Sequence, residues 1–203
     1  MIRKRLYLIR HGLTEWNRCN RFQGASNISL CEEGIEQAKR LSKRMSKFPL
    51  DAVYASDLDR ALQTAQIIAQ PHDLPVNIVP QLREINFGEW EGLTKEEIIK
   101  LKKYDYNAWR DMPHKALFPG EGNLEKVRQR VMTGMKSILE RHETGNIAVV
   151  SHGGCLKIII MSLLGLDLSF YKHFWLGNTS LSIIDVHEDR KVLSLLNDMS
   201  HLE

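Results

Sequence analysis

The sequence predicts an α/β fold in which a largely parallel β-sheet carries helices on both faces. Two patterns support this prediction. Short, wholly apolar runs such as residues 6–9 and 147–150 are typical of strands that are buried on both faces. These runs alternate with segments in which apolar residues recur every three or four positions, as in amphipathic helices. A length of 203 residues suffices for one domain with a sizeable core, so we expect a single domain over residues 1–203.

Strands and helices are expected to alternate along the whole chain. The elements of the first half are a strand at residues 6–9, a polar loop at residues 12–31, a helix from Cys31, a strand at residues 50–56, a helix capped by Ser56 or Asp57, and a strand at residues 76–79. Residues 82–93 match no element. The elements of the second half are a helix that opens with the capping-box pattern of Thr94 and Glu97, a long helix capped by Asn123, a strand at residues 147–150, a buried helix after it, and a hairpin with its turn at residues 187–190.

Composition and charge exclude several classes of protein. The 28 Lys and Arg residues against 25 Asp and Glu give a net charge of +3, too small to indicate nucleic-acid binding. The N-terminus lacks a signal-peptide pattern, and the longest apolar block, residues 156–166, is too short to span a bilayer. Three cysteines form neither a disulfide framework nor a metal motif. We therefore expect a cytoplasmic protein that binds neither nucleic acid nor a membrane, with a homodimer left open.

Polar residues interrupt the apolar pattern at the ends of expected elements. Arg10 and His11 end the first strand, and His152 ends a later one. Arg60 lies in the first turn of the helix after the second strand, and Glu84 follows an apolar residue in the unassigned segment. The carboxyl ends of parallel strands and the starts of the following helices share one edge of a sheet, where ligands bind. We therefore expect these five side chains to converge.

Two arginines, two histidines and helix N-termini together make a pocket for an anion. The guanidinium group of an arginine can donate two parallel hydrogen bonds to the oxygens of one phosphate, and helix N-termini add free N–H groups. The same positive charge argues against a divalent metal, and no other cluster has the spacing of metal ligands. We expect neither a metal nor a cofactor. A phosphoryl site of this kind must use side chains both as nucleophile and to neutralise charge.

Histidine suits the role of nucleophile, because a neutral ring nitrogen is available near pH 7. A carboxylic acid such as Glu84 would then protonate the leaving oxygen. The neighbouring arginines favour the ionised carboxylate, whereas a bound phosphate dianion favours the protonated acid. The residues alone leave this assignment open.

The chain resembles the histidine phosphatase (phosphoglycerate mutase-like) superfamily over essentially its whole length. The opening motif is Arg10-His11-Gly12 with Thr14 and Asn17. The supporting segments, in order, are Gln23-Gly24, Tyr54 to Ala61 with Thr64-Ala65, Leu82 to Ile85, Phe87 to Gly92, and Ser151-His152-Gly153. Each of these motifs alone is weak evidence for the superfamily, but their occurrence together and in this order is highly specific for it.

The resemblance implies a fold and a set of roles. The fold is a three-layer sandwich with a mostly parallel six-stranded sheet that has one antiparallel strand. His11 becomes phosphorylated, and Glu84 is the proton donor and acceptor. The phosphoryl oxygens are bound by a set that consists of Arg10, His11, Asn17, Arg60, His152 and Gly153. Gln23, Gly24 and Glu84 are assigned to the substrate. Asn178 and Thr179 are assigned a structural role because they lie at the start of an expected strand, not because of the resemblance.

The substrate is expected to be a small-molecule phosphate monoester. The length, the Trp90-Glu91-Gly92 segment and the C-terminal end resemble the α-ribazole phosphatase and broad-specificity branch, so α-ribazole 5′-phosphate is the first candidate. A broad-specificity or phosphoserine-type phosphatase, a phosphoglycerate mutase, and a regulatory domain that only binds phosphorylated ligands are the alternatives. Residues 119–123 read Pro-Gly-Glu-Gly-Asn where that branch often has Pro-Gly-Gly-Glu-Ser, and this departure leaves the specificity open.

An irregular insert at about residues 94–122 is the expected substrate lid. It contains the aromatic residues Tyr104 and Trp109, which we assign to substrate binding. Simple packing of these rings is the alternative.

Overall fold

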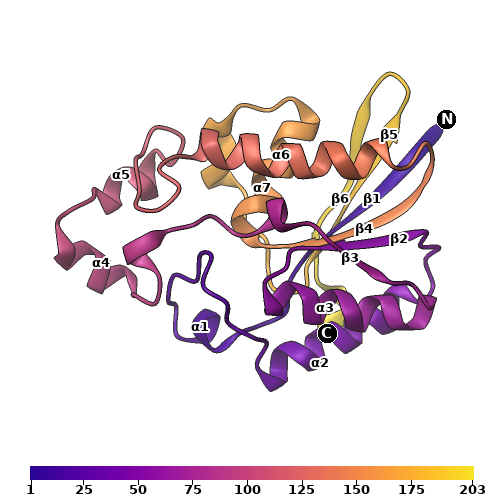
Figure 1. Ribbon diagram of the computed structural model, residues 1–203, viewed down its shortest axis with the longest axis horizontal. Coiled ribbons are helices and arrows are strands. Elements are labelled where there is room, and N and C mark those ends of the chain that lie inside the picture. Colours follow the sequence, from indigo (N-terminus) through magenta and orange to yellow (C-terminus); the bar gives the residue numbers. More distant parts are fainter.

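Six strands form one mixed sheet in the computed structural model, which describes residues 1–203 (Figure 1). The strands are β1 (Ile2–Arg10), β2 (Ala52–Ala55), β3 (Val76–Ile78), β4 (Gly145–Ser151), β5 (Leu181–His187) and β6 (Lys191–Asp198). Their order across the sheet is β3-β2-β4-β1-β5-β6. Strand β4 pairs in parallel with β1 and β2, and β3 in parallel with β2, whereas β5 is antiparallel to β1 and β6. The predicted α/β fold with a six-stranded mixed sheet is confirmed.

Helices cover both faces of this sheet. The α-helices of the chain are α1 (Glu15–Arg18), α2 (Glu32–Met45), α3 (Asp59–Ala69), α4 (Lys95–Leu101), α5 (Tyr106–Asp111), α6 (Leu124–Glu140) and α7 (Gly153–Leu164). Helices α4 and α5 lie away from the sheet (Figure 1). Helices α2 and α3 lie on one face, and α6 and α7 lie on the other (Figure 1). Successive residues of β1 point to opposite faces: Leu6 and Leu8 join the core with α6 and α7, and Tyr7 and Ile9 join the core with α2 and α3. No helix combines the length and the apolar composition that crossing a lipid bilayer requires.

The register of the sheet brings the predicted site residues to one edge. Arg10 pairs with Ser151 across the β1–β4 ladder, and Ala55 of β2 pairs with Val150. The three strands therefore end level with one another. The residues that follow them, among them His11 and His152, leave the sheet side by side.

Two sequence predictions differ from the structure near this edge. The loop at residues 12–31 contains the short helix α1, which Thr14 and Asn17 start with a complete capping box. Helix α3 is preceded by Leu58, whose side chain offers no cap, so the prediction of Ser56 or Asp57 is wrong. Those two side chains have other partners, His152 for Ser56 and Arg83 for Asp57.

The predicted starts of the two helices in the second half are confirmed. Thr94 and Glu97 form a complete capping box at α4, and the side chain of Asn123 accepts a hydrogen bond from the backbone N–H of Lys126 at α6. At α2, Cys31 gives no side-chain cap. The unassigned segment, residues 82–93, begins at the end of one 3₁₀ turn, Pro80–Leu82, and contains a second, Gly88–Trp90.

Candidate active site

His11 is buried, and its ring is held in one orientation. Only 2% of the residue is exposed. Its Nδ1 atom lies 2.7 Å from the carbonyl oxygen of Gly12, so Nδ1 carries the proton and Nε2 keeps a free lone pair. Burial, together with the positive charges of Arg60 and Arg10, holds the pKa of His11 well below the usual histidine value of 6.5. His11 is therefore a neutral base at physiological pH.

His152 directly precedes α7 and faces His11. The centroids of the two rings are 5.1 Å apart. Arg60 donates from Nε to Nδ1 of His152 across 3.2 Å, so Nε2 carries the proton and donates to Oγ of Ser56, 2.9 Å away. Burial and the nearby charge of Arg60 also hold the pKa of His152 well below 6.5.

Arg60 joins His152 to the loop after α1. Its side chain is completely buried, and burial lowers the pKa of Arg60 to about 10. The two terminal nitrogens donate to the carbonyl oxygens of Gly24 and Ser26, each across 2.7 Å. Gly24 has a φ of +54°, and a Cβ atom there would lie 2.2 Å from the carboxylate of Glu91, so glycine is required. Each terminal nitrogen keeps one N–H for another acceptor.

Arg10 presents a buried donor that has no partner. One terminal nitrogen donates to the carbonyl oxygen of Leu176 across 2.6 Å, whereas Nε makes no hydrogen bond. An unpaired buried donor costs about 1–3 kcal/mol, so this atom favours an anion at the site. A Cβ atom on Gly153 would lie 3.4 Å from Nε, so the glycine leaves this side of Arg10 open. Burial lowers the pKa of Arg10.

Asn17 is oriented by its neighbours so that its amide nitrogen stays available. Its Oδ1 accepts from the backbone N–H of Thr14 at 3.3 Å and from Nδ2 of Asn178 at 3.1 Å. The Nδ2 group of Asn17 makes no hydrogen bond within the chain. Gln23 accepts from the hydroxyl of Thr14 across 2.9 Å and so belongs to the same loop network. Asn178 also donates to the carbonyl oxygens of His11 and Gly12, 3.1 Å each, and this fixes the turn after β1.

Glu84 lies at the N-terminus of α7. Its Oε2 accepts from the backbone N–H of Gly154 at 2.9 Å, and its Oε1 accepts from Ile85 at 3.0 Å and from Cys155 at 3.1 Å. The carboxylate therefore caps the helix that starts beside His152, where a negative charge is favourable. The structure brings Glu84 to the same helix end as the two histidines.

Arg130 and Glu121 support the segment that carries Glu84. Arg130 donates to the carbonyl oxygens of Gln81, Arg83 and Glu84, and it forms an ion pair with Glu121 at 2.7 Å. Glu121 is the acidic residue of the segment that departs from the expected motif, so the altered segment still supplies a carboxylate here. These two side chains and Glu84 line one pocket with three others, Ala25, Arg83 and Asn86. This pocket adjoins the predicted acid.

The two aromatic residues assigned to the lid lie in an aromatic cluster. Tyr104 packs on Trp90 with a centroid distance of 6.2 Å. Trp109 contacts Phe118 at 5.0 Å and Tyr171 at 5.8 Å. Tyr171 belongs to the 3₁₀ turn Leu168–His173 and reaches the region of Glu84. The structure thus brings Trp109 near the site through Tyr171, and it places Tyr104 farther along the cluster.

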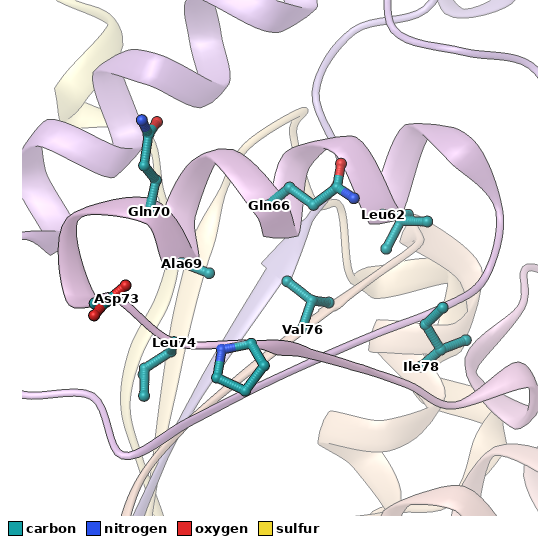
Figure 2. A pocket seen from close by; sticks show the side chains of 9 residues that line it. Leu62, Gln66, Ala69, Gln70, Asp73, Leu74, Val76 and Ile78 are labelled. Carbon is teal, nitrogen blue, oxygen red and sulfur yellow. The ribbon is translucent and has the colours of Figure 1, made fainter.

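A second pocket lies between α3 and the edge strand β3. Figure 2 shows its lining, which includes Leu62, Gln66, Asp73 and Ile78. It contains no arginine, lysine or histidine, so it offers no site for a phosphate. The buried arginines and histidines described above lie instead at and after the carboxyl ends of β1, β2 and β4.

Lys157 was not assigned a function from the sequence. It interrupts an apolar helix one turn after Gly153, and this interruption was the available signal. Its ammonium nitrogen lies 4.6 Å from the centre of the Tyr171 ring. Burial lowers the pKa of Lys157 to about 8, although the charge of Glu84 opposes this shift.

The fold and this cluster define a protein with a neutral, buried histidine beside buried arginines at one edge of its sheet, an arrangement suited to a phosphoryl group. The family model described as Histidine phosphatase superfamily (branch 1) matches residues 6–199. This chain therefore belongs to the histidine phosphatase superfamily.

Known relatives resemble the chain over nearly its full length. Phosphoserine phosphatase 1 of Hydrogenobacter thermophilus is 36% identical, over 98% of this chain and 94% of its own. The adenosylcobalamin/alpha-ribazole phosphatase of Escherichia coli is 34% identical, over 95% of each chain. Bacillus stearothermophilus YhfR, a solved structure, has a TM-score of 0.92 and 33% identity, over 98% of this chain and 100% of that one. The chain is accordingly a histidine-dependent phosphatase.

Proposed function

We propose that this phosphatase hydrolyses small-molecule phosphate monoesters through a phosphohistidine at His11. The observation that carries the proposal is the hydrogen bond of 2.7 Å from Nδ1 of His11 to Gly12. This bond directs the lone pair to Nε2, and Nε2 attacks phosphorus while the bond from phosphorus to the ester oxygen breaks. Water then attacks the phosphohistidine, the nitrogen–phosphorus bond breaks, and His11 returns to its neutral form with inorganic phosphate released.

The buried donors bind the three non-bridging oxygens. Nε of Arg10 has no other partner, and the remaining N–H groups of Arg60 and the amide of Asn17 are available to oxygen. His152 and the open space beside Gly153 complete the phosphate site. Donors that are already in place do not need to reorganise as charge shifts toward these oxygens in the transition state. We propose a reaction that needs no metal ion, because this fixed positive charge neutralises the phosphoryl group.

Glu84 is proposed as the acid and base of the reaction. It donates a proton to the ester oxygen as the alcohol leaves, and it takes a proton from the attacking water in the second step. Its position is supported by the N–H groups of Gly154 and Cys155, which place the carboxyl at the end of α7.

Two substrates are supported by relatives of nearly equal similarity. The E. coli relative is named an α-ribazole phosphatase, and the H. thermophilus relative a phosphoserine phosphatase. α-Ribazole 5′-phosphate and phosphoserine are therefore both candidates. Residues 94–122 with Trp109 and Tyr104 are proposed as the lid over the alcohol part of the substrate, since Trp109 packs on Tyr171 beside Glu84.

One experiment tests the reaction itself. Purified protein in EDTA is incubated with p-nitrophenyl phosphate, α-ribazole 5′-phosphate, phosphoserine and 3-phosphoglycerate, and released phosphate is measured beside the His11→Ala variant. We expect release by the wild type only, and an acid-labile phosphohistidine after rapid quenching. Failure to hydrolyse any of these esters over a wide pH range would refute the proposal. Exchange between 3- and 2-phosphoglycerate without phosphate release would indicate a mutase.

A further inference from the structure

Lys157 lies on the face of α7 that points at the reaction centre. A Cβ atom on Gly153 would lie 3.4 Å from Nε of Arg10, and one on Gly154 would lie 2.6 Å from Oε1 of Glu84. The hydroxyl of Tyr171 would be 3.0 Å from that same Gly154 position. Residues three and four positions apart share one face of a helix, so Lys157 follows the two glycines on the same face.

The ammonium group of Lys157 has no acceptor of its own. The ion pairs made by lysines in this protein involve Lys39, Lys103 and Lys136. Lys157 makes no hydrogen bond, and its nearest described partner is the ring of Tyr171 at 4.6 Å. Lys157 is half-buried, and its Nζ is not among the fully buried atoms that lack a partner, so water reaches this ammonium group and an anion can approach it by the same route.

Glu84 is near enough for its charge to act on Lys157, but the two side chains form no ion pair. Both of its oxygens already accept backbone N–H groups, from residues 85, 154 and 155. In the proposed function, the unpaired Nε of Arg10 and the side chain of Arg60 bind the phosphate group of the substrate. Lys157 therefore remains as a separate cation on the side of Glu84, where the leaving alcohol must lie.

We infer that Lys157 binds a carboxylate on the alcohol part of the substrate, so the preferred substrates are phosphate monoesters of small hydroxy acids. This inference rests on the proposed function. One helical turn, about 5.4 Å, separates Lys157 from Gly153, so the carboxylate lies only a few carbon atoms from the ester oxygen. Tyr171, which is 7% exposed, offers its hydroxyl as a second donor. α-Ribazole 5′-phosphate has no carboxylate to meet this lysine.

The test compares two substrates that differ only in the carboxylate, phosphoserine and phosphoethanolamine. Wild-type protein is expected to have a kcat/KM at least about tenfold higher for phosphoserine, the usual effect of one hydrogen bond to a charged group. Lys157→Met should lower this ratio toward one, mainly through KM for phosphoserine, and Lys157→Arg should keep most of it. Lys136→Met removes an exposed lysine of α6 and is the matched control.

The outcomes separate the two proposals. Equal kcat/KM for the two substrates in wild type, or an unchanged ratio in Lys157→Met, overturns the role of Lys157 and leaves the phosphatase proposal standing. Absence of all hydrolysis overturns the phosphatase proposal. In that case binding of the two esters to wild type by calorimetry still decides the role of Lys157, because only phosphoserine should bind tightly. If Lys157→Met does not fold, the wild-type ratio and Lys157→Arg decide.

Discussion

The Nε atom of Arg60 donates a hydrogen bond to Nδ1 of His152 across 3.2 Å, and neither residue is exposed to solvent. This bond fixes the tautomer of His152 and joins it to the loop at Gly24 and Ser26, which the same guanidinium binds. Arg60 is therefore the link between α3 and the loop after α1, in addition to its proposed role as a phosphate ligand. The ammonium group of a lysine, a single charge on a flexible chain, cannot reproduce the hydrogen bonds that the planar guanidinium makes in three directions.

Arg60→Lys is expected to lower kcat by about 10²–10³, the usual cost of losing one preorganised donor to a developing charge. Stability should fall as well, because the two loop carbonyls lose their buried donor. Steady-state kinetics with p-nitrophenyl phosphate and thermal unfolding measure the two effects. Arg128→Lys, an exposed position on α6, is the control. Near-normal turnover in Arg60→Lys would contradict the role of the fork.

Glu84→Gln should lower turnover by about 10²–10⁴ if Glu84 is the general acid. The loss should be large with phosphoserine, whose alcohol leaves poorly, and small with p-nitrophenyl phosphate, whose phenol needs little protonation. The amide keeps one oxygen for the N–H groups of α7, so the helix cap is weakened by only about 1 kcal/mol. A panel of esters with graded leaving groups measures this dependence. Equal losses across the panel would argue for a purely structural role.

The pH dependence of stability follows from the buried histidines. The pKa of His11 in the folded protein lies well below the ordinary value of 6.5 because of burial and of the charges of Arg60 and Arg10. Above pH 6.5 the ring is neutral in both the folded and the unfolded state, so it adds no pH dependence. As the pH falls below 6.5, only the unfolded state gains the proton, and folding weakens by up to about 1.4 kcal/mol per pH unit.

His11→Ala should therefore reduce the loss of stability between pH 6.5 and pH 5, measured by urea unfolding. His173→Ala, which removes an exposed histidine, is the control and should retain the wild-type slope. Activity should also begin to fall only below pH 6.5, because His11 stays unprotonated, and so able to attack phosphorus, down to its lowered pKa. An acid limb above that pH would contradict the depressed pKa.

Much of the site could be predicted from strand ends. Arg10, His11 and His152 interrupt apolar runs, and this interruption marks the edge of a parallel sheet whatever the family. Glu84 was harder to predict, because its segment has no periodicity and Glu84 itself lies in irregular chain between two 3₁₀ turns. The predicted cap of α3 was wrong because the helix begins later than expected, at Asp59. Oγ of Ser56 accepts from the N–H of Leu58, before the helix, and from His152.

Lys157 and Arg130 could not be assigned from local pattern. Each lies on a helix where a charged residue ordinarily points to solvent. Their roles depend on what the fold places opposite them, namely Tyr171 at 4.6 Å for Lys157 and the carbonyl groups of residues 81, 83 and 84 for Arg130. Contacts of this kind arise between segments far apart in sequence, and one sequence carries no periodic signal for them.

The proposed lid is tested most directly at Trp109. Its ring packs on Phe87 at 5.2 Å, on Phe118 at 5.0 Å and on Tyr171 at 5.8 Å. Trp109→Ala should destabilise the protein by up to about 3 kcal/mol, the low end for a buried aromatic residue, because Trp109 is only half-buried. If the insert forms the wall of the substrate site, the loss of this contact lets Tyr171 move. The ranking of substrates by kcat/KM should then change, with bulky esters gaining relative to phosphoserine.

Leu117→Ala supplies the control for the lid, because Leu117 is an exposed apolar residue in the same insert. It should change neither the ranking nor the melting temperature appreciably. Trp109→Phe keeps an aromatic ring against Tyr171 and should restore the wild-type ranking even where some stability is lost. A variant series in which stability falls but the ranking stays constant would show that Trp109 only packs, and that the specificity lies with the residues on α7.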